Sequence, residues 1–137
     1  MRFLAIDPGD KRTGLAVGDD ETGQAGPVDV ITTGDPGDLL RGIRQAIDAY
    51  DPEALVVGLP LNADGTAGPA AKKAEALARL LEQHTGLTVH RADERLTSYA
   101  ADQQMSQTGL THGQKKDRRD ALAAAAILRD FLARRGQ

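Results

Sequence analysis

The sequence predicts an α/β protein with a five-stranded mixed sheet flanked by helices. Two observations carry this prediction. The first three apolar segments follow one another without an intervening helix, which favours an antiparallel meander. The two later apolar segments alternate with helical patterns, which favours parallel addition of strands to the same sheet. A length of 137 residues fits a single domain that spans residues 1–137.

The first two strands are joined by a tight polar turn. Phe3 to Ile6 is an apolar run that ends at one carboxylate, Asp7, and a second apolar run starts at Leu15. Residues 8–11 between them have turn chemistry, because proline fixes φ and glycine permits a positive φ. A buried, ionised aspartate is costly unless it is paired or bound to a metal. The partner of Asp7 is therefore the first functional question.

The middle of the chain contains a third strand, a helix and a central strand. Residues 27–33 are rich in β-branched side chains, which is typical of a strand. The following helix starts with Asp35 as its N-cap and Pro36 in its first helical position, and it stops at residues 51–52. Residues 54–58 are all apolar, which indicates a strand covered on both faces.

The second half of the chain is predicted to place loops at the carboxyl ends of strands. The alanine run at residues 123–126 keeps the last helix thin and allows it to pack closely on a sheet. The predicted order is a loop at residues 59–66, a helix at 69–84, a strand at 87–91, a short helix from Thr97 or Ser98 to 107, a basic loop at 108–116, and a last helix starting near Arg118.

Composition excludes several classes of protein. The chain has no cysteine, which excludes disulfides, thiolate zinc sites and cysteine nucleophiles and is consistent with a reducing cytoplasm. We find no targeting segment and no run long enough to span a membrane. The sequence therefore predicts a cytoplasmic protein with no membrane partner.

The charge is distributed unevenly along the chain. Residues 112–137 contain seven Lys or Arg against three Asp, a balance of +4, although the whole chain has a net charge of -3. Residues 1–111 therefore carry -7. This asymmetry predicts a basic patch on an acidic body, as in a protein that binds nucleic acid. A solvated helix with counter-charges explains the same pattern equally well.

Acidic residues stand at the ends of three predicted elements. Asp7 ends the first strand, Glu94 follows the fifth, and Asp117 and Asp120 stand at the head of the last helix. If these carboxylates converge, they repel one another until one holds a proton or the group binds a cation. Oxygen ligands favour Mg²⁺ or Mn²⁺. Each acid also has a purely structural interpretation, as a turn residue or as a partner of a helix dipole.

Four segments together resemble the YqgF/RuvX family, a group of bacterial Holliday junction resolvases with an RNase H-like fold. The segments are residues 5–19, 57–66, 93–98 and 120–128, and they match the family's order and spacing over nearly the whole chain. The resemblance implies that the chain is a single RNase H-like nuclease domain.

The resemblance also implies the site residues. The family's acidic triad falls on Asp7, Glu94 and Asp120 as catalytic residues and metal ligands, with Asp117 as an additional acid one helical turn before Asp120. Whether three or four carboxylates hold metal stays open. The implied chemistry is phosphodiester hydrolysis assisted by two Mg²⁺ or Mn²⁺ ions.

Basic and polar residues near these acids are the candidate nucleic-acid contacts. Structural interpretations compete with this one: surface charge for the lysines and arginines, an ion pair of Arg95 with Glu94, a turn at Asp64-Gly65, and a helix cap for Thr66. The candidates are Lys11, Arg12, Asn62, Thr66, Arg95, His112, Lys115, Lys116, Arg118 and Arg119.

Two substrates remain open for such a nuclease. The family resemblance points to 5′-end maturation of the small-subunit ribosomal RNA precursor, which we favour, or to branched DNA such as Holliday junctions in recombination and repair. A resolvase needs two active sites, and the sequence shows no apolar stripe beyond the core, so we expect a monomer or a weak homodimer. A non-catalytic nucleic-acid-binding assembly factor is a further alternative. An actin-like ATPase is disfavoured, because 137 residues leave no room for a second lobe.

Overall fold

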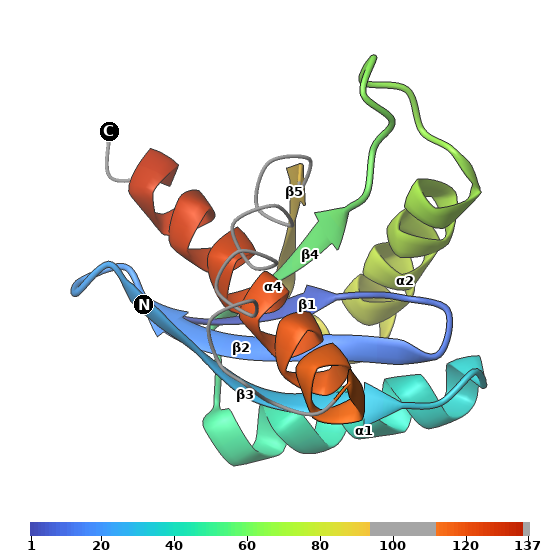
Figure 1. Ribbon diagram of the computed structural model, residues 1–137. Coiled ribbons are helices and arrows are strands. Elements are labelled where there is room, and N and C mark those ends of the chain that lie inside the picture. The colour runs from blue at the N-terminus through green and yellow to red at the C-terminus, as the bar shows by residue number, and fades with distance from the viewer. Residues whose placement is uncertain (94–111, 136–137) are drawn as a thin grey trace.

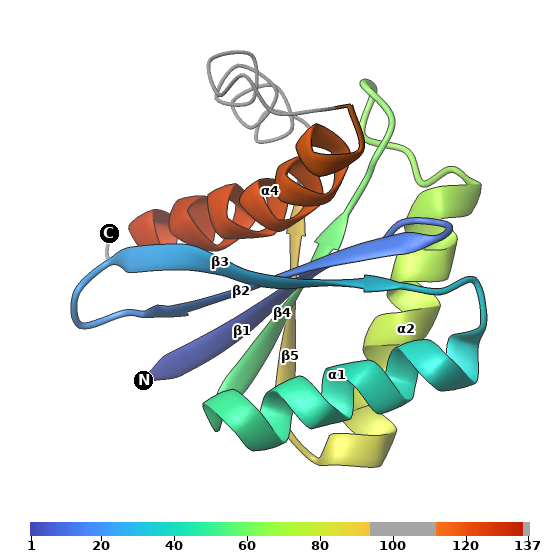
Figure 2. The same ribbon diagram turned by 60° about the horizontal axis from the view of Figure 1, so that its bottom comes forward.

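The protein has three layers, with one sheet between helices. The computed structural model describes residues 1–93 and 112–135. Helix α4 covers one face of the sheet, and α1 and α2 cover the other (Figures 1 and 2). The elements are β1 Arg2–Asp7, β2 Arg12–Asp19, β3 Gln24–Thr32, α1 Pro36–Tyr50, β4 Ala54–Leu59, α2 Pro69–Thr85, β5 Thr88–Asp93 and α4 His112–Arg135.

The sheet confirms the predicted mixed topology. Its five strands lie in the order β3-β2-β1-β4-β5. The pairs β1–β2 and β2–β3 are antiparallel, whereas β4 is parallel to both β1 and β5. The first and fifth strands are separated by β4 alone. Their carboxyl ends therefore lie at the same edge of the sheet.

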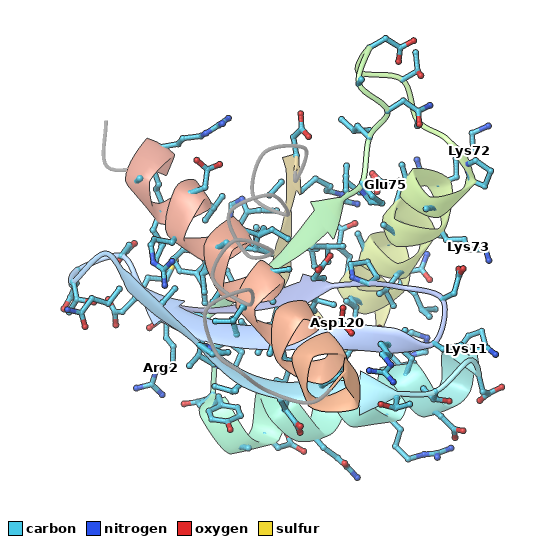
Figure 3. The ribbon with its side chains drawn as sticks, viewed as in Figure 1. Arg2, Lys11, Lys72, Lys73, Glu75 and Asp120 are labelled. Atoms are coloured by element: carbon cyan, nitrogen blue, oxygen red, sulfur yellow. The ribbon has the colours of Figure 1, made fainter. Side chains whose placement is uncertain are left out.

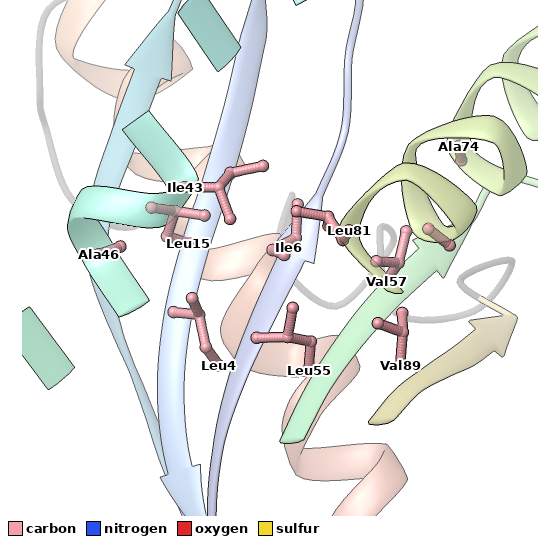
Figure 4. Packing of buried hydrophobic residues seen from close by; sticks show 11 residues of the cluster. Leu4, Ile6, Leu15, Ile43, Ala46, Leu55, Val57, Ala74, Leu81 and Val89 are labelled. Carbon is pink, nitrogen blue, oxygen red and sulfur yellow. The ribbon is translucent and has the colours of Figure 1, made fainter. Parts of the chain in front are cut away.

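Side chains alternate between the two faces of β1. Leu4 and Ile6 pack under α1 and α2, whereas Phe3 and Ala5 pack under α4. The α4 face is built largely from small side chains, which lets the helix lie close to the strands. The cluster on the opposite face, shown in Figure 4, comprises Leu4, Ile6, Leu15, Ile43, Ala46, Leu55, Val57, Ala74, Ala78, Leu81 and Val89.

The ends of α1 follow the sequence signals. Asp35 is the N-cap, its carboxylate accepts a hydrogen bond from the Asp38 amide at 2.9 Å, and Pro36 opens the helix. Asp51 ends the helix in a left-handed conformation with φ of 50°. Its amide donates to the Ile47 carbonyl, and Pro52 prevents the helix from continuing. The predicted start and stop of this helix are confirmed.

The start of α4 corrects the sequence prediction. The helix begins at His112 and not near Arg118, so residues 112–116 are helical and not part of a loop. Gln114 and the two lysines that follow it are strong helix formers, and Gly113 lies in the first turn, where its amide needs no intrahelical acceptor. The predicted helix between Thr97 or Ser98 and residue 107 lies outside the described residues.

Three aromatic rings join α4 to the sheet. Phe3, His90 and Phe131 lie with ring centroids 5.0 to 6.1 Å apart, and the Arg135 guanidinium lies 5.3 Å from the Phe3 ring centroid. Burial, and to a lesser extent the charge of Arg135, lowers the pKa of His90 below its ordinary value of 6.5. The neutral imidazole is therefore the favoured form of His90 in this cluster.

No helix in the described part of the chain is both long and apolar enough to cross a membrane.

The lowered pKa of His90 predicts a loss of stability in acid. Below about pH 6.5 the unfolded chain binds a proton that the folded protein does not, so the free energy of unfolding falls as pH falls. The slope is at most about 1.4 kcal/mol per pH unit for one such group. Chemical denaturation at several pH values should show a smaller loss for His90→Leu than for the natural protein. His84→Gln, which alters an exposed histidine on α2, is the control and should keep the natural slope.

Candidate active site

Asp7 lies on the face of the sheet that α4 covers. It is the last residue of β1 and follows Phe3 and Ala5 in the alternation that buries both under α4. Its cross-strand partner on β2 is Gly14. Paired residues on neighbouring strands point to the same face, so the half-buried Asp7 side chain and the α carbon of Gly14 face the helix together.

Helix α4 meets the sheet at the position of Asp120. A Cβ atom on Gly14 would overlap the backbone carbonyl group of Asp120 and would lie 3.0 Å from the Ala121 nitrogen. Only a glycine leaves room for the helix backbone at this distance. The contact brings the Asp120 backbone against β2, beside the strand position that carries Asp7. Two of the predicted acids are thus neighbours through Gly14.

Asp120 is not at the head of its helix. Because α4 begins at His112, Asp120 lies two turns inside it, and the first turn of α4 contains no acid. The favourable effect of a carboxylate at a helix N-terminus is limited to the first turn, so the dipole interpretation of Asp120 is wrong. Its carboxylate is half-buried, and one oxygen, Oδ2, is fully buried with no hydrogen bond. The residue has other interactions within the protein.

The other two predicted acids are only partly placed. Asp117 lies one turn before Asp120 on the same helix backbone. Glu94 lies outside the described residues, directly after Asp93 at the end of β5. Among the side chains that the structure describes, those of residues 1–93 and 120–135, no group of three or more His, Cys, Asp or Glu is arranged to hold a metal ion.

The donor atoms at this place fit a hard divalent cation. Asp7 and Asp120 supply carboxylate oxygens on a partly buried face, where two like charges repel unless a proton or a cation lies between them. Carboxylates without thiolate or imidazole are the ligands that Mg²⁺ and Mn²⁺ prefer. The residues present therefore fit the cation that the sequence predicts.

The β1–β2 turn and the start of β2 carry two of the predicted nucleic-acid contacts. Lys11 is exposed in the turn, and its carbonyl accepts a hydrogen bond from the Thr33 amide at 2.9 Å. Arg12 is half-buried and is the first residue of β2. Lys73 on α2 lies 3.7 Å from Asp10 in the turn, so the start of α2 lies beside it (Figure 3). These positions place Lys11 and Arg12 within five residues of Asp7.

The loop after β4 is closed by its own hydrogen bonds. Asn62 donates to Thr66 Oγ1 at 3.0 Å, and Asp64 accepts from the Thr66 amide and hydroxyl. Gly65 has φ of 87°, as a tight turn requires. This arrangement confirms the turn at Asp64-Gly65. The interpretation of Thr66 as a helix cap is wrong, because Gly68 is the N-cap of α2.

The predicted basic patch at the end of the chain divides into two groups. At the carboxyl end of α4, Arg129 donates to the Ala25 carbonyl at 3.1 Å, and Arg135 pairs with Asp20 at 3.3 Å. These cations fasten the helix to the β2–β3 hairpin. The predicted contacts at the other end of α4, His112, Lys115, Lys116, Arg118 and Arg119, have helical backbone, and Arg95 lies outside the described residues.

Comparison with known proteins identifies the family. Residues 1–134 match the model of the RuvX family, which is described as Holliday junction resolvase. The chain belongs to the RuvX family. A relative from Opitutus terrae, named "Putative pre-16S rRNA nuclease", is 44% identical over 98% of this chain and 93% of its own length. A relative of the same name from Azotobacter vinelandii is 39% identical over 97% of this chain and 94% of its own length.

Solved structures agree on the fold. The RuvC protein of T. thermophilus, in complex with a Holliday junction substrate, has a TM-score of 0.61 at 18% identity and covers 99% of this chain and 96% of its own. The fowlpox virus Holliday junction resolvase has a TM-score of 0.59 at 13% identity and covers 98% of this chain and 99% of its own. The RuvX-family chain therefore has the RNase H-like fold that its sequence predicts.

Sequence reasoning missed the glycines that seat α4. Gly14, Ala16 and Gly18 recur with a period of two, which places all three on one face of β2. A Cβ on Gly18 would lie 2.9 Å from Leu128 Cδ2 on α4 and 2.7 Å from the Gln24 carbonyl. This stripe of small residues, opposite the alanine-rich helix, is the sequence signal that could have predicted the contact.

If a metal binds at Asp7 and Asp120 as the sequence predicts, the melting temperature should rise. At a free Mn²⁺ concentration about 100-fold above its dissociation constant, binding to the folded state alone adds about 2.7 kcal/mol of stability. This corresponds to a rise of about 10 °C for a domain of this size. Thermal unfolding with and without Mn²⁺ should show the rise in the natural protein and its loss in Asp7→Asn and Asp120→Asn.

The matched control is Asp48→Asn, which neutralises an exposed carboxylate on α1, on the opposite face of the sheet. This variant should keep the full rise. An equal rise in all four proteins would mean that Mn²⁺ binds elsewhere.

Proposed function

We propose that this RuvX-family protein is a divalent-metal-dependent nuclease acting on structured RNA, and that it processes the 5′ end of the small-subunit ribosomal RNA precursor. The observation that carries the proposal is the position of Gly14, which is the cross-strand partner of Asp7 and lies against the Asp120 backbone on the α4 face. The helix dipole does not explain Asp120, because this residue lies two turns inside α4. Such a substrate implies a cytoplasmic enzyme.

The proposed roles follow from position and charge. Asp7, Asp120 and Glu94 would hold two Mg²⁺ or Mn²⁺ ions, with Asp117 as an auxiliary ligand. Bound metal supplies a Lewis acid and a water of lowered pKa for attack on phosphorus. The chain itself contributes fixed carboxylates on two rigid elements, a strand end and a helix interior.

The basic residues near the acids have a complementary role in the proposal. Lys11 and Arg12 follow Asp7 closely enough to hold a phosphate beside the carboxylates, and Arg95 adjoins Glu94 in the sequence. Asn62 and Thr66 are proposed to reach the nucleic-acid backbone from the loop after β4, after exchanging their mutual hydrogen bond for contacts with the substrate.

Two observations favour RNA over a four-way DNA junction. Relatives that match 97 to 98% of the chain bear the pre-16S rRNA nuclease name. A junction resolvase must also present two active sites, which requires a dimer. Among the described residues, Met1 is the one large hydrophobic side chain that is exposed, so the described surface offers no apolar dimer interface. We therefore propose a monomer or a weak homodimer.

Cleavage assays with a panel of substrates test the proposed function. The purified protein with Mn²⁺ or Mg²⁺ is given a small-subunit ribosomal precursor RNA, a four-way DNA junction, flapped DNA and single-stranded DNA. We expect metal-dependent shortening of the precursor at its 5′ end and slower cleavage of the DNA substrates. Preferential symmetric cleavage of the junction would favour the resolvase alternative, and binding without cleavage of any substrate would favour an assembly factor.

The variant Asp7→Asn separates chemistry from folding. The substitution replaces one carboxylate oxygen with an NH2 group, which removes a metal ligand at nearly constant volume. Cleavage should therefore fall at least about 10³-fold. Circular dichroism and substrate affinity measured without metal should stay close to those of the natural protein. Cleavage by Asp7→Asn at the natural rate in Mn²⁺ would contradict the proposed role of this residue.

The first turns of α4 are proposed to bind the nucleic-acid backbone. Replacing Lys115, Lys116, Arg118 and Arg119 with alanine should weaken binding and reduce the slope of log affinity against log salt by about 0.7 to 0.9 for each phosphate that the variant no longer neutralises. The matched control replaces Arg41 and Arg44 on the opposite face and should leave the slope unchanged. Unchanged affinity of the α4 variant at low salt would place the binding surface elsewhere.

A further inference from the structure

We propose that Gly14 is a positioning residue that sets the distance between the Asp7 and Asp120 carboxylates. The inference rests on the proposed function, because it concerns the metal ligands of that site. The inference goes beyond the proposed function by assigning a role to a residue with no side chain, which has no functional group that could touch metal or substrate.

Gly14 touches both acids through the backbone. It is the cross-strand partner of Asp7 in the β1–β2 ladder, so the two α carbons are held at the spacing of a strand pair. On its α4 side it lies against the carbonyl group of Asp120. Two backbone contacts that share one glycine therefore set the separation of the two acids.

The contact between Gly14 and α4 cannot adapt by side-chain movement. A methyl group at position 14 would meet the carbonyl carbon and oxygen of Asp120 and approach the Ala121 nitrogen. All three are backbone atoms inside a helix, so no rotamer change makes room. The helix itself has to move away from the strand.

The movement of the helix would be concentrated at Asp120. The other end of α4 is fastened by Arg129 to the Ala25 carbonyl and by Arg135 to Asp20. A helix that is held at one end and lifted at the other tilts, which carries Asp120 away from Asp7. Displacing a reacting or ligating group by about 1 Å is enough to reduce activity about 10²-fold.

Gly18 provides a matched control. It lies on the same strand and face as Gly14, and a methyl group there would also be tight, 2.9 Å from Leu128 Cδ2 and 2.7 Å from the Gln24 carbonyl. Its neighbours include neither Asp7 nor Asp120. Gly18→Ala therefore tests how much the sheet–helix packing tolerates, without moving the two acids apart.

The experiment measures Mn²⁺ affinity by titration calorimetry in the natural protein, Gly14→Ala and Gly18→Ala. We expect the dissociation constant to rise about 10- to 100-fold in Gly14→Ala, as for other residues that orient metal ligands, and by less than about twofold in Gly18→Ala. In an Asp120→Asn background, adding Gly14→Ala should change the remaining affinity by less than about twofold, because the residue that Gly14 positions no longer ligates.

The outcomes separate this inference from the proposed function. If the natural protein neither binds Mn²⁺ nor cleaves RNA or DNA, the proposed function is wrong and this inference falls with it. If the natural protein does both and Gly14→Ala binds Mn²⁺ equally well, or if Gly18→Ala loses as much affinity, the positioning role alone is overturned. Folding is checked by circular dichroism, with a stabilising osmolyte if needed. Failure of Gly14→Ala alone to fold under these conditions would also overturn the inference, since Gly14 would then serve the fold as a whole.

Discussion

The architecture of the site depends on one contact between two stretches of backbone. Gly14 on β2 lies against the Asp120 carbonyl on α4, with no side chain between them. This contact sets how deeply the helix sits on the sheet, which residues of α4 face the strands, and where the helix carries its acid. Close seating also explains the small side chains of this face, such as Ala16 and Ala124, which are fully buried.

In the proposed site, fixed carboxylates would carry an electrostatic cost. Two half-buried carboxylates near each other favour any state in which their charge is reduced. Carboxylates on a mobile loop would move apart and relieve the repulsion. On the proposed assignment, carboxylates on a strand end and in a helix interior cannot, and their repulsion favours cation binding. The fold would then present Asp7 and Asp120 as ligands before any ion arrives.

The sequence predicted most of the fold through local signals, whereas its choice of site residues stays a prediction. The apolar runs of β1 and β4 and the cap at Asp35 are local signals, and each of these predictions is confirmed. The start of α4 was placed too late, because Gly113 resembles a helix breaker although glycine costs little in a first turn. Asp120 was expected at the helix head but lies inside the helix, and its role as a ligand stays what the family resemblance implies. Gly14 was missed, because its significance lies in a contact with a residue far away in the sequence.

The two faces of this sheet should differ in how freely their sequences drift. Opposite α1 and α2, branched side chains such as Ile6, Leu15 and Val57 fill the space, and a change in one is absorbed by new rotamers in its neighbours. Under α4, the tightest contact joins the backbones of Gly14 and Asp120, which have no rotamers to change. The face made of the smallest residues therefore accepts the fewest substitutions. Natural variation in the family is therefore expected to accumulate on the face that α1 and α2 cover, while residues under α4 are expected to vary little.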